Sequence, residues 1–161
     1  MITPHRLAVR AAERVWRSLR GKAQWRVLWL RHATFMIGVT GAVFDSRGRV
    51  LLLRHRFWAG CPWGPPSGYV ERGETFEETL QREVREETGL ELTDVRHRFD
   101  RSGFRLRVEV YLSGRLVSDG PLRLEEDEIL EARFFELDEL PPDLRPIHRD
   151  LIHQAHADLT S

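Results

Sequence analysis

The stretch GYVERGETFEETLQREVREETGL, residues 68–90, places seven glutamates within 23 residues. Thr75 is a suitable N-cap for a helix, because its hydroxyl can accept a hydrogen bond from a backbone N–H three residues later, and Glu78 at that position completes a capping box. Gly89 can adopt the left-handed conformation that ends many helices. These signals predict a helix over residues 76–88, with residues 68–74 as the loop that leads into it.

The glutamates of this predicted helix form two groups when side chains are placed at about 100° per residue. Glu77 and Glu78 lie in the first turn, where negative charge interacts favourably with the helix dipole. The second group occupies an arc of about 100° that overlaps the apolar side of the helix. It consists of Glu83, Glu86 and Glu87, and the apolar side consists of Phe76, Leu80 and Val84. These carboxylates therefore lie where a helix that packs on a core carries apolar side chains.

Two interpretations of Glu83, Glu86 and Glu87 remain open from this pattern: a solvated charged surface, or a binding site for a cation. Like charges one turn apart repel each other, and burial of an unpaired carboxylate costs on the order of several kcal/mol. A hard divalent cation, Mg²⁺ or Mn²⁺, would offset both costs because it prefers oxygen ligands. Arg82, one turn before Glu86, can pair with a carboxylate and orient it.

A β-hairpin is predicted before this segment. Residues 35–44, FMIGVTGAVF, and residues 49–57, RVLLLRHRF, are apolar runs that flank the turn sequence DSRG at residues 45–48. Residues 59–67, AGCPWGPPS, are rich in proline and glycine. They predict a loop and exclude a central strand, because proline cannot donate a ladder hydrogen bond.

Further elements are predicted after residue 90. Residues 104–112, FRLRVEVYL, alternate apolar and charged side chains and predict a half-buried strand, and residues 132–137 predict another. Residues 146–159 predict a short helix whose apolar stripe is Ile147, Leu151, Ile152 and Ala155.

The N-terminal region differs in charge from the rest. Residues 1–33 carry eight basic side chains and one glutamate, although the whole chain has a formal net charge of zero. Residues 5–20 predict an amphipathic helix that ends near Gly21, and residues 25–30, WRVLWL, could extend that helix or begin a strand. We therefore expect a basic helical extension over 1–33, followed by the main domain over 34–161.

The basic helix admits several partners. Packing against its own domain is the ordinary one, and a homodimer interface is another. A helix of this kind can also lie on an anionic membrane surface, contact nucleic acid, or resemble an organelle transit peptide. The sequence leaves these alternatives open.

Composition restricts the class of protein. The single cysteine, Cys61, excludes an internal disulfide and a multi-cysteine metal site, and it is compatible with a reducing cytosol, so we expect a cytoplasmic location. No apolar run reaches the roughly 18 residues that a membrane span requires.

The spacing within residues 68–90 fits the pattern G-x5-E-x7-R-E-V-x-E-E-x-G-L. Its fixed positions are Gly68, Glu74, Arg82, Glu83, Val84, Glu86, Glu87, Gly89 and Leu90. This pattern resembles the signature of the Nudix hydrolase superfamily. The resemblance covers residues 34–140, including RVLLLRHR, the approach loop WGPPSG and the later segment EARFFELDELP. It implies an α/β/α sandwich with a mixed sheet, on which residues 68–90 form a loop–helix–loop motif.

The same resemblance implies a reaction and a set of roles. Members hydrolyse nucleoside diphosphates linked to another group and use Mg²⁺ or Mn²⁺, so the expected partner is a nucleotide-type small molecule. Glu83, Glu86, Glu87 and the Ser67 carbonyl would hold the metal, Arg82 would orient a glutamate, and Glu74 would support that arrangement. An additional glutamate from the loop before the last core strand is expected, with Glu128 the first choice and Glu126 the second. Glu83 and Glu128 compete for the role of general base.

One position departs from the family pattern. Many members have two glycines after the proline, whereas this chain reads Pro66-Ser67-Gly68. Serine still offers its carbonyl, but it tolerates a positive φ much less well than glycine. We expect no loss if the backbone here does not require that conformation.

Substrate contacts are the least defined part of the sequence. Arg54 is a candidate for binding phosphate, and Trp58, Trp63 and Tyr69 are candidates for stacking on a base, with core packing the alternative for each aromatic residue. The alternative to an enzyme is a catalytically silent Nudix-fold nucleotide-binding or sensor module. Such modules usually lose a glutamate or the arginine of the motif, and this chain retains all of them.

Overall fold

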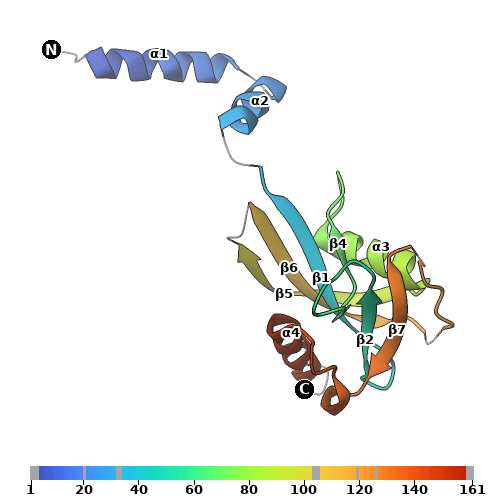
Figure 1. Cartoon of the computed structure of the whole chain (residues 1–161). Coiled ribbons are helices and arrows are strands. Elements are labelled where there is room, and N and C mark those ends of the chain that lie inside the picture. The colour runs from blue at the N-terminus through green and yellow to red at the C-terminus, as the bar shows by residue number, and fades with distance from the viewer. Residues whose placement is uncertain are drawn as a thin grey trace. The chain divides into compact units, whose positions relative to one another are not determined.

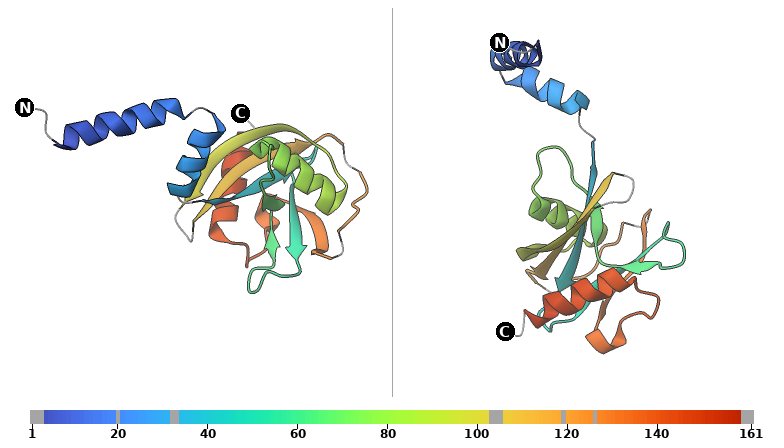
Figure 2. Two further views of the ribbon diagram at one scale, coloured as in Figure 1. Left: turned by 90° about the horizontal axis from the view of Figure 1, so that it is seen from above. Right: turned by 90° about the vertical axis from the view of Figure 1, so that its left-hand side faces the viewer.

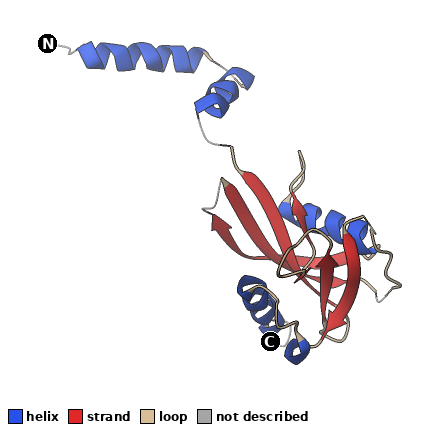
Figure 3. Cartoon of the chain, viewed as in Figure 1, coloured by secondary structure: helices blue, strands red, loops and turns tan. Residues whose placement is uncertain are grey.

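The computed structural model describes residues 4–19, 21–31, 34–102, 106–118, 120–125 and 127–158. The chain divides into two compact units, Met1–Phe35 and Met36–Ser161. Each unit is described by itself below. Figure 1 labels their elements, and Figure 3 shows that the first unit is helical whereas the second combines strands and helices.

The first unit consists of α1 (Pro4–Ser18) and α2 (Lys22–Arg31). Gly21, with a φ of 57°, separates them, so the predicted helix over 5–20 is confirmed and residues 25–30 are helical. Many apolar side chains of this unit are exposed: Val9, Val15, Trp16, Trp25, Leu28, Trp29 and Leu30. Within the described residues, no helix is both long enough and apolar enough to cross a membrane.

The second unit is built on a mixed sheet. Its strands are β1 (Met36–Phe44), β2 (Val50–His55), β3 (Trp63–Gly64), β4 (Ser67–Tyr69), β5 (Leu92–Ser102), β6 (Arg107–Leu116) and β7 (Ile129–Phe135). The main path runs β3-β2-β1-β6-β5, and β4 pairs with β1 and β7 with β2. Strands β1 and β6 are parallel and the other pairs antiparallel.

Two helices cover the two faces of the sheet, as Figure 2 shows: α3 (Phe76–Thr88) and α4 (Pro146–Ala157). Alternate residues of a strand point to opposite faces. Accordingly, Val39 and Val43 of β1 pack in the core that contains Leu80 and Val84 of α3. Ala42 and Phe44 pack in the core that contains Leu151 and Ile152 of α4. The predicted α/β/α sandwich with a mixed sheet is therefore confirmed.

Local signals predicted α3 residue by residue. Thr75 accepts a hydrogen bond from the Glu78 N–H at 3.2 Å, Glu78 accepts one from the Thr75 N–H at 2.8 Å, and Gly89 ends the helix with a φ of 72°. The helix lies very close to β1 at Gly41, where a Cβ atom would meet Leu80 Cδ2 at 2.3 Å. Glycine is required at that position because a side chain would collide with a core leucine.

The prediction missed β5. Its pairing with β6 shifts register between Thr93 and Arg96 and again between His97 and Phe99. Each shift moves the following side chains to the other face, so the sequence loses the regular alternation by which a strand is recognised. The hairpin, the later strands and the C-terminal helix were predicted with shifted ends, and β3 lies at an edge of the sheet, as the prolines beside it require.

Candidate active site

A cavity of about 590 Å³ lies in the second unit, between α3, β4, the loop before β7 and the residue that precedes α4. Most of the predicted metal and catalytic residues line it. The lining residues are Val39, His55, Trp58, Ser67, Gly68, Tyr69, Val70, Glu71, Arg82, Glu83, Glu86, Glu87, Arg107, Glu109, Glu125, Glu128 and Arg145. The cavity is therefore rich in carboxylates, with arginines among them.

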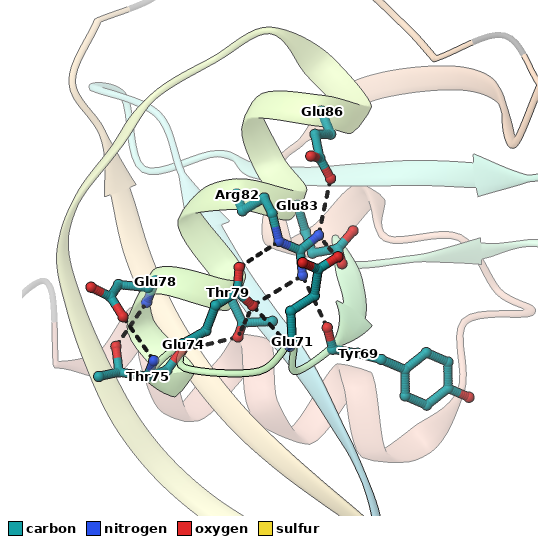
Figure 4. Close-up of polar contacts among 9 residues, drawn as sticks. All are labelled: Tyr69, Glu71, Glu74, Thr75, Glu78, Thr79, Arg82, Glu83 and Glu86. Atoms are coloured by element: carbon teal, nitrogen blue, oxygen red, sulfur yellow. Dashed lines mark hydrogen bonds and ion pairs between the residues drawn. The ribbon is translucent and has the colours of Figure 1, made fainter.

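Arg82 is the centre of a hydrogen-bond network (Figure 4). Its Nε donates to Glu74 at 2.7 Å, and its Nη1 donates to Glu83 at 2.8 Å and to Glu86 at 3.0 Å. Its Nη2 donates to the Tyr69 carbonyl at 2.9 Å. This network lowers the pKa of Glu74 to about 2, chiefly through the Arg82 hydrogen bond, and the same carboxylates raise the pKa of Arg82. Arg82 thus fixes α3 to the loop that leads into it.

Gly68 allows the backbone of β4 to approach Glu83. A Cβ atom at residue 68 would lie 1.7 Å from Glu83 Oε1 and 1.9 Å from its Cδ. No side chain can occupy that space while Glu83 keeps its position. The neighbouring Ser67 is not among the described residues with a positive φ, so its backbone does not require glycine, as expected.

Glu87 is the most deeply buried carboxylate of the site. The residue is 3% exposed, and its Oε2 has no hydrogen-bond partner among the described residues. Burial raises its pKa well above the ordinary value, the charges of Glu83 and Glu128 raise it further, and a hydrogen bond from the Ser67 backbone opposes this. Burial also raises the pKa of Glu83. Arg82 partly compensates the charge of Glu83, whereas Glu87 forms no ion pair with any described residue.

Glu128 reaches the cavity from the segment before β7. The Arg56 N–H donates to the Glu128 carbonyl at 2.8 Å, and the Glu128 N–H donates to the Glu125 carbonyl at 3.1 Å, so this loop is attached to the end of β2. Both Glu125 and Glu128 line the cavity, and their charges act on Glu87. Glu126, the second choice for this role, lies outside the described residues.

The carboxylate oxygens that line the cavity are the type of ligand that a divalent cation prefers. Hard cations take carboxylate oxygens, and the buried, unpartnered Glu87 Oε2 is such a donor. In the portion of the chain that is described, no group of three acidic or imidazole side chains is arranged as a set of metal ligands. Arg82 accounts for this arrangement, because Glu83 and Glu86 are both hydrogen-bonded to its Nη1. A cation would compete with Arg82 for these two carboxylates.

Only two of the four residues predicted to contact the substrate line the cavity. Trp58 and Tyr69 line the cavity. Trp63 is partly buried and packs edge-on against Phe135, with ring centroids 5.3 Å apart, next to the core that contains Leu151 and Ile152 of α4. Arg54 lies 4.0 Å from Glu131 and is not among the lining residues. The structure thus brings only part of this predicted set to the cavity.

Several lining residues were not predicted from the sequence. His55, Arg107, Glu109, Glu125 and Arg145 come from the end of β2, from β6, from the loop before β7 and from the residue before α4. No local motif marks them, because each reaches the cavity through sheet register or through the position of α4. Gly89 and Leu90, which end the motif, are not among the lining residues.

Comparisons with known proteins identify the family of this chain. Residues 34–155 match the sequence model of the NUDIX domain. The chain is 37% identical over 86 residues to the NAD-capped RNA hydrolase NudC of Actinobacillus succinogenes, covering 50% of this chain and 30% of that protein. It is 35% identical over 120 residues to NudC of Haemophilus influenzae PittGG, covering 66% of this chain and 43% of that protein. The chain thus spans less than half the length of these curated relatives.

Solved structures show the same fold. A MutT NUDIX hydrolase from Burkholderia pseudomallei aligns with a TM-score of 0.62 at 28% identity, over 76% of this chain and 98% of that one. A NUDIX hydrolase from Nitrosomonas europaea aligns with a TM-score of 0.63 at 21% identity, over 80% of this chain and 73% of that one. With the loop–helix–loop motif complete and the sandwich in place, the chain belongs to the Nudix hydrolase family.

Proposed function

We propose that this protein hydrolyses the diphosphate linkage of a nucleoside diphosphate that carries a second group, with Mg²⁺ or Mn²⁺ as cofactor. The observation that carries this proposal is the buried Glu87 carboxylate, whose Oε2 has no partner among the described residues although it lines an open cavity. A buried carboxylate without a counter-charge is unfavourable, and a cation at this position would remove that cost. The complete motif argues against a catalytically silent module.

We propose a separate role for each group of residues in the site. Glu83, Glu86, Glu87 and the Ser67 carbonyl would hold the cation, which when bound polarises a phosphoryl group and lowers the pKa of an attacking water. Arg82, through its hydrogen bonds to Glu74 and to the Tyr69 carbonyl, would hold α3 against the loop that leads into it. Glu128 is favoured over Glu83 as the base that accepts the proton of the water, because Glu83 is already bonded to Arg82.

The substrate we propose is of nucleotide type. Because the curated relatives are named NAD-capped RNA hydrolases, NAD and NAD-capped RNA are the first compounds to test. Nucleoside triphosphates, ADP-ribose, dinucleoside polyphosphates, nucleotide sugars and CDP-alcohols complete the set. The cytoplasmic location expected from the single cysteine remains a prediction.

Hydrolysis is expected for at least one of these compounds in the presence of Mg²⁺ or Mn²⁺, and none after chelation of the metal. The measurement is release of phosphate, pyrophosphate or a nucleoside monophosphate, for the wild-type protein and for Glu87→Gln in parallel. Absence of turnover on every compound, or equal turnover by both proteins, would refute the enzymatic proposal and favour a binding module.

We infer that the N-terminal unit serves a separate role, contact with an anionic membrane surface. Arg10, Arg14 and Arg17 of α1 are exposed, and so are Trp25 and Trp29 of α2, at 73% and 68%. Arginines with interfacial tryptophans suit the headgroup region of a bilayer. A homodimer interface and nucleic-acid contact remain the alternatives that an experiment must separate.

Deletion of residues 1–33 is expected to leave turnover unchanged, because every lining residue of the cavity lies between Val39 and Arg145. The same deletion should abolish salt-sensitive binding to vesicles that contain phosphatidylserine. Vesicle flotation and sedimentation velocity measure the two properties. Vesicle binding that survives the deletion would contradict the membrane role, and loss of a dimer on deletion would assign the helices to self-association instead.

A further inference from the structure

The arginines that line the cavity differ in how their charge is neutralised. Arg82 is bonded to Glu74, Glu83 and Glu86. Arg107 forms an ion pair with Glu109 and lies over the ring of Tyr69 at 5.2 Å. Arg145 has no carboxylate partner among the residues that the structure describes. Its positive charge therefore stays available in a cavity that otherwise contains paired arginines.

Arg145 is held by an aromatic ring instead of an acid. Its guanidinium carbon lies 4.6 Å from the ring centroid of Trp58. A cation–π contact of this kind immobilises the guanidinium group but leaves its N–H donors free. Although Arg145 is the N-cap residue of α4, its side chain makes no capping hydrogen bond. The side chain is consequently not needed to begin the helix.

The ring of Trp58 is itself held in place by neighbouring side chains. It stacks on His55, with centroids 3.8 Å apart and an interplanar angle of 13°, and it lies 6.1 Å from His148. Gly64 makes room for it, because a Cβ atom there would meet Trp58 Cζ3 at 2.5 Å. Burial, and secondarily the charge of Arg145, lower the pKa of His55 and His148 to about 4. Both imidazoles are thus neutral near pH 7 and do not share the role of Arg145.

We propose that Arg145, held over Trp58, binds a phosphate group of the substrate. A diphosphate that enters a cavity lined by Glu83, Glu86, Glu87, Glu125 and Glu128 requires positive charge, and a guanidinium fork matches phosphate oxygens. The inference rests on the proposed function, since it assigns one anchoring point of that substrate. Trp58 acts through Arg145 as a positioning residue, and Arg54 is not required for this contact.

Replacement of Arg145 by Gln is expected to weaken binding of imidodiphosphate, a hydrolysis-resistant probe, by about 10- to 100-fold in the presence of Mg²⁺. Titration calorimetry measures this dissociation constant. The KM of the substrate found in the screen should rise by a similar factor, whereas kcat should change less, because the contact is made before and during reaction. Arg145→Lys should lose less than Arg145→Gln.

Trp58 supplies a second, independent measurement. Trp58→Phe keeps an aromatic ring beneath the guanidinium and should bind imidodiphosphate like the wild type. Trp58→Leu should weaken binding in the same direction as Arg145→Gln, and the double variant should lose little more than either single one, because both remove the same contact. Arg96→Gln is the matched control, because Arg96 is exposed, pairs with Asp94 and does not line the cavity.

The outcomes separate this inference from the proposed function. If no compound is hydrolysed but imidodiphosphate binding still depends on Arg145, the function fails and the phosphate site stands. Equal dissociation constants for wild type and Arg145→Gln, or no binding by the wild type, would overturn the phosphate site. Tighter nucleotide binding by Arg145→Gln would also overturn it, because Arg145 would then be covering Trp58 as a stacking surface for a base.

Discussion

Replacement of Glu87 by Gln is expected to lower kcat/KM by at least about 10²-fold and also to raise the melting temperature of the metal-free protein. Glutamine has the size of glutamate and can still accept the hydrogen bond from the Ser67 backbone, but it carries no charge. Glu87 is 3% exposed, and its Oε2 has no partner among the described residues. Glutamine avoids the unfavourable ionisation of a buried carboxyl group, so the free energy of unfolding at neutral pH should increase by about 1 to 3 kcal/mol. Each kcal/mol should raise the melting temperature by about 2–4 °C.

The same substitution changes how stability depends on pH. The pKa of Glu87 is raised in the folded protein, so the folded state keeps a proton that the unfolded chain releases near pH 4.3. The free energy of unfolding of the metal-free wild type therefore falls as the pH rises from that value to the folded-state pKa. The free energy of unfolding of Glu87→Gln should not show this decrease with rising pH.

Differential scanning calorimetry with and without Mg²⁺ tests these expectations. The wild type should gain stability from the metal, and Glu87→Gln should gain much less. Glu77→Gln is the control, because Glu77 is exposed in the first turn of α3. If Glu87→Gln is less stable than the wild type without metal, the carboxylate has a stabilising partner and the argument for a cation at this position fails.

Replacement of Gly68 by Ala should reduce kcat/KM by about 10²-fold, because a displacement of about 1 Å in a catalytic group can cost that much. The new Cβ atom would lie 1.7 Å from Glu83 Oε1, so the carboxylate must move away and lose its hydrogen bond with Arg82. The backbone itself should accept alanine, because Gly68 is not among the glycines with a positive φ. The loss should therefore appear in activity and Mg²⁺ affinity more than in melting temperature.

Gly120→Ala is the matched control for Gly68→Ala. A Cβ atom at residue 120 would lie 3.4 Å from Leu90 Cδ2, an ordinary contact, and Gly120 does not line the cavity. Steady-state kinetics and thermal unfolding of both variants give the comparison. Full activity of Gly68→Ala would mean that turnover uses a different position of Glu83.

The loop–helix–loop motif was predictable because its determinants are local. The capping box of Thr75 and Glu78 and the left-handed Gly89 involve hydrogen bonds between residues a few positions apart. The burial of Glu87 was predictable for a related reason, since helical periodicity places it between Phe76 and Leu80 on the side that packs on the sheet. Strand β5 was not predictable in the same way, because its two register shifts break the alternation.

The amino-acid sequence by itself determined the family, the ends of α3 and the α3 carboxylates that face the cavity, since these depend on spacing within one helix and its flanking loops. Only the tertiary structure decided which distant residues join them. It placed Trp58 at the cavity and Trp63 against the core, paired Arg54 with Glu131, and left Arg145 over Trp58 without a described acidic partner. Those outcomes depend on the pairing of β2 with β3 and with β7 and on where α4 begins, and no short stretch of sequence encodes any of these.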